Sequence, residues 1–280
     1  MIQQIWTICT ILQQLGQYTN ITCGGHIHIG ANYLTNLQAW KNLLELWTNT
    51  EYILYIISNK EGEPPRPGIA QHATPISSYI EEQFDKLYLY GINDLDIFKN
   101  GIIDNICKKR GCGINFQNLK KGKMQTIEFR ISNGTLSSET WLENIILFGG
   151  LVRASEELYI IQQKDKFKRT IHEKYLLDCF ESIRNKSVDE EQTLELLLQI
   201  VAPEGMHNVY KERYRINRVK LKQAAKTEEY IKKHVSKKSI RILRKKALVF
   251  TGFNRVTTPE YNTTHLKTKG DFSERNIERD

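Results

Sequence analysis

Alternating apolar and polar residues predict a strand near the N-terminus that carries two histidines on one face. Residues 21–30 read Ile-Thr-Cys-Gly-Gly-His-Ile-His-Ile-Gly. Successive side chains of a strand point to opposite faces, so the apolar side chains lie on one face while His26 and His28 lie on the other. The neighbouring glycines are too small to block access to the imidazole rings. The pattern therefore predicts an open site on this strand.

A second stretch repeats the alternation further along the chain. Residues 125–131 read Gln-Thr-Ile-Glu-Phe-Arg-Ile, which places Glu128 and Arg130 together on the polar face of a strand. If both strands belong to one sheet whose apolar faces meet the same helices, the two histidines, the glutamate and the arginine converge on the opposite face.

The spacing of apolar residues elsewhere predicts helices. These expected helices cover residues 2–15, 35–58, 77–89, 139–163, 171–183 and 190–201. Asn59 to Gly68 is rich in proline, which removes a backbone donor and fixes the backbone, so we expect a loop there. This loop carries Arg66. The order of elements predicts an α+β fold, with an antiparallel sheet backed by helices and a helical, basic C-terminal extension.

Composition is that of a globular protein with no membrane segment. The chain has 280 residues, of which 40% are hydrophobic, enough for a core in one large domain or two modest ones. Its five cysteines lack zinc-ligand spacing, and reduced thiols in a cytosol fit them best. No apolar run has the length needed to cross a bilayer, and no signal-peptide pattern opens the chain. We therefore expect a cytoplasmic protein without a membrane partner.

The net charge of +8 is concentrated near the C-terminus. Residues 205–255 hold sixteen Lys or Arg against three Glu, a local net charge of +13. One interpretation is a solvated helix face. The other is an arm that binds nucleic acid or an acidic polypeptide, with Tyr210, Tyr214 and Tyr230 as stacking partners.

These features divide the chain into three parts. Residues 1–163 form the expected catalytic region, residues 164–256 the helical basic extension, and residues 257–280 a tail with little to bury, for which we expect disorder.

Histidines two residues apart on a strand suit a divalent metal, because both rings face the same way and neutral imidazole is a common ligand. The residues alone leave other interpretations open. His26 and His28 could be histidines with no special role, and Glu128 with Arg130 could be a surface ion pair of little energetic value.

The combined motifs resemble a known family. The segment Cys23-Gly24-Gly25-His26-Ile27-His28-Ile29-Gly30, the Arg66 loop, and Thr126-Ile127-Glu128-Phe129-Arg130 followed by Asn133-Gly134-Thr135-Leu136 are similar to the putative amidoligases, members of the glutamine synthetase-like carboxylate-amine ligases. The similarity covers residues 19–158. It implies a glutamine synthetase-like antiparallel sheet.

The resemblance also implies a reaction and a set of roles. ATP would activate a carboxylate as an acyl phosphate, an amine would displace the phosphate, and Mg²⁺ would neutralise the phosphate charges. His26 and Glu128 would share the metal, His28 would lie against the nucleotide, and Arg130 would hold substrate or the transferred phosphoryl group. Arg66 would contact phosphate. The substrates would be small-molecule or peptide carboxylates and amines.

One departure from the family pattern concerns acidic residues. No Asp or Glu precedes Glu45, whereas members of the superfamily open with a strand of metal-binding glutamates. We therefore expect an N-terminally truncated catalytic region, a missing strand supplied by another polypeptide, or a degenerate relative, and in each case poor activity of this chain alone. Relatives of glutamine synthetase can build sites between subunits, so a homo-oligomer is also open. Two other functions stay open: a metal-dependent hydrolase using His26, His28 and Glu128, and a non-catalytic module that binds an anionic partner.

Overall fold

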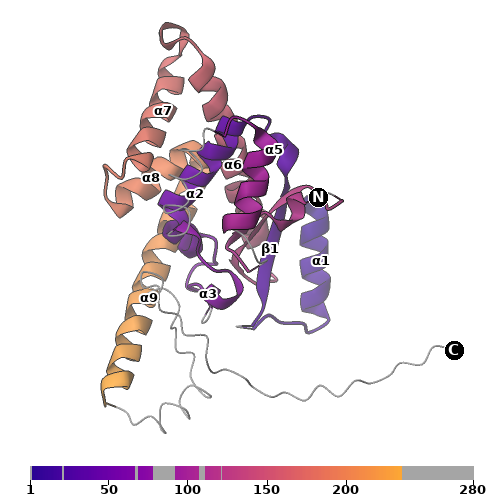
Figure 1. Ribbon diagram of the computed structural model, residues 1–280. Helices are drawn as coiled ribbons and strands as arrows, with labels where there is room; N and C mark the ends of the chain where they lie inside the picture. The colour runs from indigo at the N-terminus through magenta and orange to yellow at the C-terminus, as the bar shows by residue number, and fades with distance from the viewer. Residues whose placement is uncertain are drawn as a thin grey trace, which may run out of the picture.

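A computed structural model describes residues 2–20, 22–66, 69–77, 92–106, 111–120 and 122–234 (Figure 1). Most of the helix expected over 77–89 and the whole tail expected over 257–280 lie outside the described residues. The described part is mixed helix and strand, which confirms the α+β fold class. No described helix has both the length and the apolar character that a bilayer span requires.

Both predicted strands form and lie side by side. β1 (Gly24–Gly30) pairs antiparallel with β3 (Thr126–Asn133), and the short β2 (Ile114–Asn115) pairs with the other edge of β3, giving the order β1-β3-β2. Ile127, Phe129 and Ile131 of β3 are fully buried. The apolar face of the sheet therefore meets the core, and its polar face is left for the site.

Two long helices cover the apolar face. α2 (Leu37–Ile57) packs against α6 (Ser138–Gln163), and both contact the sheet. The Phe129 ring is 4.6 Å from the Phe148 ring of α6 and 5.7 Å from the Trp47 ring of α2, measured between centroids. Burying these aromatic rings stabilises the layer by roughly 25 cal/mol for each Å² of apolar surface removed from water.

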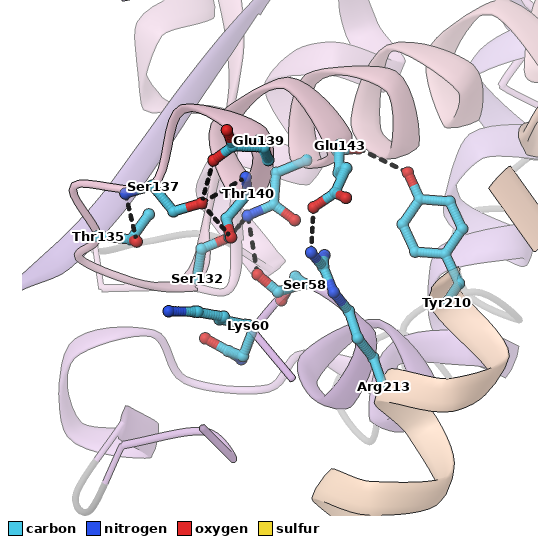
Figure 2. Close-up of polar contacts among 12 residues, drawn as sticks. Ser58, Lys60, Ser132, Thr135, Ser137, Glu139, Thr140, Glu143, Tyr210 and Arg213 are labelled. Atoms are coloured by element: carbon cyan, nitrogen blue, oxygen red, sulfur yellow. Dashed lines mark hydrogen bonds and ion pairs between the residues drawn. The ribbon is translucent and has the colours of Figure 1, made fainter. Parts of the chain in front are cut away.

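The start of α6 is fixed by a serine cap. Ser137 is the N-cap: its Oγ accepts from the backbone N–H of Thr140, and its own N–H donates to Thr135 Oγ1 (Figure 2). One turn later, the Asn144 side chain donates to Ser58 O at the end of α2. These bonds hold the turn after β3 and the end of α2 in one place.

The first helix forms where its pattern predicts. α1 (Ile2–Gln14) is followed by a turn at Gly16, whose φ of +72° suits glycine after a helix C-terminus. It contacts α6, and Cys9 is its one buried residue. The rest of the fold covers only a small part of the apolar face predicted for α1, since Ile8, Ile11 and Leu15 remain exposed.

In the described part of the chain, three α-helices follow α6. α7 (Ile171–Arg184), α8 (Glu190–Val201) and α9 (His207–His234) all contact α2, and α8 also packs on α6. Figure 1 shows α9 running away from the side of the molecule opposite α1. The shorter elements are α3 (Ile69–His72), α5 (Leu95–Gly101), the π-helix η2 (Ile102–Ile106) and the 3₁₀ helices η1 (Ala31–Tyr33), η3 (Gln117–Leu119), η4 (Lys166–Lys168) and η5 (Glu204–Met206).

Four basic residues of α9 are ion-paired, and one of them, Arg213, is buried. Lys211, Arg213, Arg215 and Arg218 each form an ion pair with a glutamate. The two tyrosines predicted as stacking partners are buried: Tyr210 donates to Glu143 O, and the Tyr214 hydroxyl contacts Glu190. That prediction was wrong for both, because they face the core. The side chain of Tyr230 and residues 235–255 lie outside the described part.

Candidate functional site

The polar face of the sheet borders a cavity. The register places His28 of β1 opposite Glu128 of β3, and β2 adds Asn115 beside Glu128. The cavity, of about 620 Å³, is within the range of small-molecule sites. Its lining includes the four side chains that alternation predicted, together with residues from the segment before β3: His26, His28, Glu128, Arg130, Asn118, Gly122, Lys123 and Met124.

Glu128 is the centre of this arrangement. Its Oε1 accepts from Arg130 Nη1 at 2.6 Å and lies 3.2 Å from His26 Nδ1 and 3.7 Å from His28 Nε2. Its Oε2 accepts from Asn115 Nδ2 at 2.7 Å. Burial opposes ionisation, yet the Asn115 hydrogen bond and the Arg130 charge outweigh it and hold the pKa of Glu128 below its usual value. Glu128 is therefore a carboxylate near neutral pH.

A β-bulge brings His26 into contact with Arg130. The register shifts between Gly25 and Ile27, so that Arg130 and Ile131 of β3 both lie opposite His26. Bulges of this kind turn a side chain toward a site. Arg130 Nη1 consequently lies 3.4 Å from His26 Nδ1 while it donates to Glu128. The sequence pattern predicted the shared face, but it carried no signal for this bulge.

Partial burial lowers the pKa of His26, and the Arg130 charge lowers it further against the opposing effect of Glu128. The ring is therefore neutral near pH 7, and one of its nitrogens has a free lone pair. Nδ1 faces the carboxylate, so its protonation state decides whether it donates to Glu128 or offers a lone pair to a cation.

Two asparagines join the site without having been predicted. Asn118 Nδ2 lies 3.3 Å from His28 Nδ1, and Thr126 Oγ1 lies 3.1 Å from the same nitrogen. Asn115 is fully buried beneath Glu128. A strand of two residues followed by a 3₁₀ turn is too short to show periodicity, so no pattern in the sequence marked either asparagine.

Arg66 lies elsewhere on the same face and does not line the cavity. Its side chain is buried, Nη1 donates to Ser132 O at 2.9 Å, and its backbone N–H donates to Asn133 Oδ1. The guanidinium packs directly on Gly24, where an added Cβ would lie 2.8 Å from Nη2. This position gives Arg66 a role in packing the proline-rich loop onto the strand ends.

The site supplies few ligands for a metal. Among the described residues, no group of three or more His, Cys, Asp or Glu side chains is arranged to hold an ion. His26 Nδ1 and Glu128 Oε1, 3.2 Å apart, have the separation of two ligands of one ion. Magnesium commonly binds proteins through one or two carboxylates and takes its other ligands from phosphates and water. The residues therefore fit a metal that arrives with a phosphorylated substrate.

The first half of the chain matches one known family. Residues 1–152, slightly more than half of the chain, match the family described as "Putative amidoligase enzyme", and this stretch contains β1, β2, β3 and the cavity lining. No curated protein and no solved structure shows significant similarity to the chain. The match confirms the resemblance read from the strand motifs, and the chain belongs to this amidoligase family.

Proposed function

We propose that the chain is an ATP-dependent carboxylate-amine ligase whose reaction takes place in the cavity on the polar face of the sheet. The observation that carries this proposal is the convergence of His26, His28 and Arg130 on the ionised Glu128. Family membership supports ligase chemistry in general, and the cavity supplies cationic groups for phosphate and carboxylate.

The reaction would proceed in two displacements. A carboxylate oxygen of the acid substrate attacks the γ-phosphorus of ATP, the bond to the β–γ bridging oxygen breaks, and ADP leaves. The amine nitrogen then attacks the acyl carbon, the carbon–oxygen bond to phosphate breaks, and the amine loses a proton to water. The products are an amide, ADP and phosphate.

The side chains fit distinct roles in this reaction. His26 and Glu128 would hold magnesium, which when bound neutralises phosphate charge. Arg130 would hold the substrate carboxylate or the transferred phosphoryl group. His28, held by Thr126 and Asn118, would lie against the nucleotide.

Low activity of the isolated chain follows from the ligand set. Glu128 is the one carboxylate in the described lining of the cavity, and a single carboxylate with one imidazole binds magnesium weakly. We expect slow turnover unless a further chain contributes acidic ligands. Robust turnover by the purified chain would contradict this expectation.

The same ligand count weighs against a zinc hydrolase, because catalytic zinc sites use three protein ligands and no such group occurs among the described residues. It is compatible with a module that binds nucleotide or another anion without turnover. Nucleotide binding and turnover must therefore be measured separately.

The first experiment is calorimetric titration of the folded chain with magnesium-ATP, run beside His26→Ala and Glu128→Ala. We expect both variants to weaken binding at least about tenfold, or roughly 1.4 kcal/mol. The matched controls are His172→Ala and Glu157→Gln, which change an exposed histidine and a partly exposed glutamate remote from the cavity. Absence of binding in the folded wild-type chain would overturn the proposal.

A further inference from the structure

The segment between η3 and β3 supplies the part of the cavity wall that is not sheet. Gly122, Lys123 and Met124 all line the cavity, and all three are exposed. They come directly before β3, which carries Glu128 and Arg130. The cationic side chain of Lys123 and the apolar side chain of Met124 therefore line the same cavity as Glu128 and Arg130.

The backbone holds these residues in an unusual shape. Gly122 has a φ of +79° and Gln125 has a φ of +54°, so left-handed residues flank Lys123 and Met124 on both sides. A left-handed conformation is uncommon for a residue other than glycine, and such strain concentrates at functional sites.

Hydrogen bonds fix the base of this loop. The Gln125 N–H donates to Asn118 O, and its side-chain amide donates to Leu119 O and Lys120 O. Gln125 O in turn accepts from the N–H of Ala31, just beyond β1. Hydrogen bonds thus hold the base of the loop to the η3 segment and to the residue after β1. The tip of the loop, Lys123 and Met124, lines the cavity.

The side chains of Lys123 and Met124 are both left exposed by the fold. The Lys123 ammonium group makes no hydrogen bond or ion pair in the part of the chain that the structure describes. Met124 is 68% exposed although its side chain is apolar. Arg130 already compensates the Glu128 carboxylate, so Lys123 adds an excess positive charge to the cavity wall. A ligand with an anionic group and an adjacent apolar ring would satisfy both side chains.

We propose that the Lys123–Met124 tip is a nucleotide-recognition element, in which Lys123 donates to the phosphates and Met124 packs against the base. Gln125 is a positioning residue that presents the tip through its side-chain clasp and left-handed backbone. This inference rests on the proposed ATP-dependent function and assigns the nucleotide contacts within that site.

The test compares two ligands, magnesium-ATP and magnesium-tripolyphosphate, by calorimetry on the full chain. Lys123→Gln should weaken both about tenfold, because it removes a phosphate contact. Met124→Ala should weaken ATP several-fold and leave tripolyphosphate unchanged, since tripolyphosphate has no base, and Met124→Leu should restore ATP binding. Gln125→Ala should weaken ATP while circular dichroism shows an intact fold.

The matched control is Lys120→Gln, which removes the same charge from an exposed lysine of the same loop that does not line the cavity. It should change either affinity less than about twofold. Equal effects of Lys120→Gln and Lys123→Gln, or equal effects of Met124→Ala on both ligands, would overturn the inference while the proposed function stands. Failure of the folded wild-type chain to bind magnesium-ATP would overturn both.

Discussion

Arg130 Nη1 lies 2.6 Å from Glu128 Oε1, and this contact on one face of β3 pairs the carboxylate of the cavity with a fixed positive charge. The exposed fractions of the two side chains are 18% and 7%, so the pair is screened less than a surface ion pair. Together with the Asn115 hydrogen bond, the Arg130 charge keeps the carboxylate ionised. Partial burial lowers the pKa of the neighbouring His26, and the same guanidinium lowers it further. Arg130 therefore favours, in both groups, the forms that a cation or phosphate would meet.

This relationship predicts opposite changes in the pKa of His26 for two substitutions. Arg130→Gln should raise the pKa, because it removes a positive charge that disfavours the imidazolium. Glu128→Gln should lower it further, because it removes the carboxylate that favours the imidazolium. NMR titration of the His26 ring protons in both variants checks the signs. Shifts in the same direction would show that the two charges do not act on His26 as the geometry requires.

The same groups predict how stability depends on pH. Both His26 and Glu128 have a folded-state pKa below the unfolded value, so each stabilises the fold above its unfolded pKa and loses that contribution as pH falls. For His26 the loss begins below the ordinary value of 6.5, and for Glu128 it begins below 4.5. Urea unfolding from pH 8 to pH 5 should show a decline that His26→Ala reduces. An unchanged decline in that variant would assign it to other groups.

Two adjacent glycines of α6 should respond differently to alanine. A Cβ on Gly150 would lie 1.8 Å from the backbone oxygen of Val201, so α6 and α8 could not keep their close approach. Gly150→Ala should cost at least about 3 kcal/mol. Gly149 has no atom within 4 Å of an added Cβ, and Gly149→Ala should stabilise the helix by about 0.5–1 kcal/mol. Thermal and urea unfolding measure both, and similar effects would contradict the packing of α8 on α6.

Two arginines of α9, Arg213 and Arg215, should also differ in how much they stabilise the fold. Arg213, with a side chain 5% exposed, pairs with Glu143 of α6, next to the bond from the Tyr210 hydroxyl to Glu143 O (Figure 2). Arg213→Ala should destabilise the protein by about 1–3 kcal/mol, because it leaves Glu143 without its charged partner. Arg215 pairs with Glu212 within α9 and is 68% exposed, so Arg215→Ala should cost less than about 1 kcal/mol. Equal losses of unfolding free energy would show that Arg213 does not fasten α9 to α6.

The main residues of the site can be predicted from family motifs and periodicity in the sequence. Alternation placed His26, His28, Glu128 and Arg130 on shared faces, because a two-residue repeat is a property of any strand. It could not place Asn115, Lys123 or Met124, which lie in segments without a repeat. Asn115 is placed by the pairing of β2 with β3, and Lys123 and Met124 are placed by the hydrogen bonds that Gln125 makes with Asn118 and Ala31.

The sequence by itself determined the strands β1 and β3, most helix positions and the family, since these depend on local periodicity, capping residues and short motifs. Only the tertiary structure decided how charged residues are used. Arg66 is buried on Gly24, and Arg213 is paired with Glu143 far from it in sequence. Both environments arise from contacts between elements that are distant in the sequence. The interaction energy of a charge depends on its burial and its neighbours, and local sequence patterns contain neither.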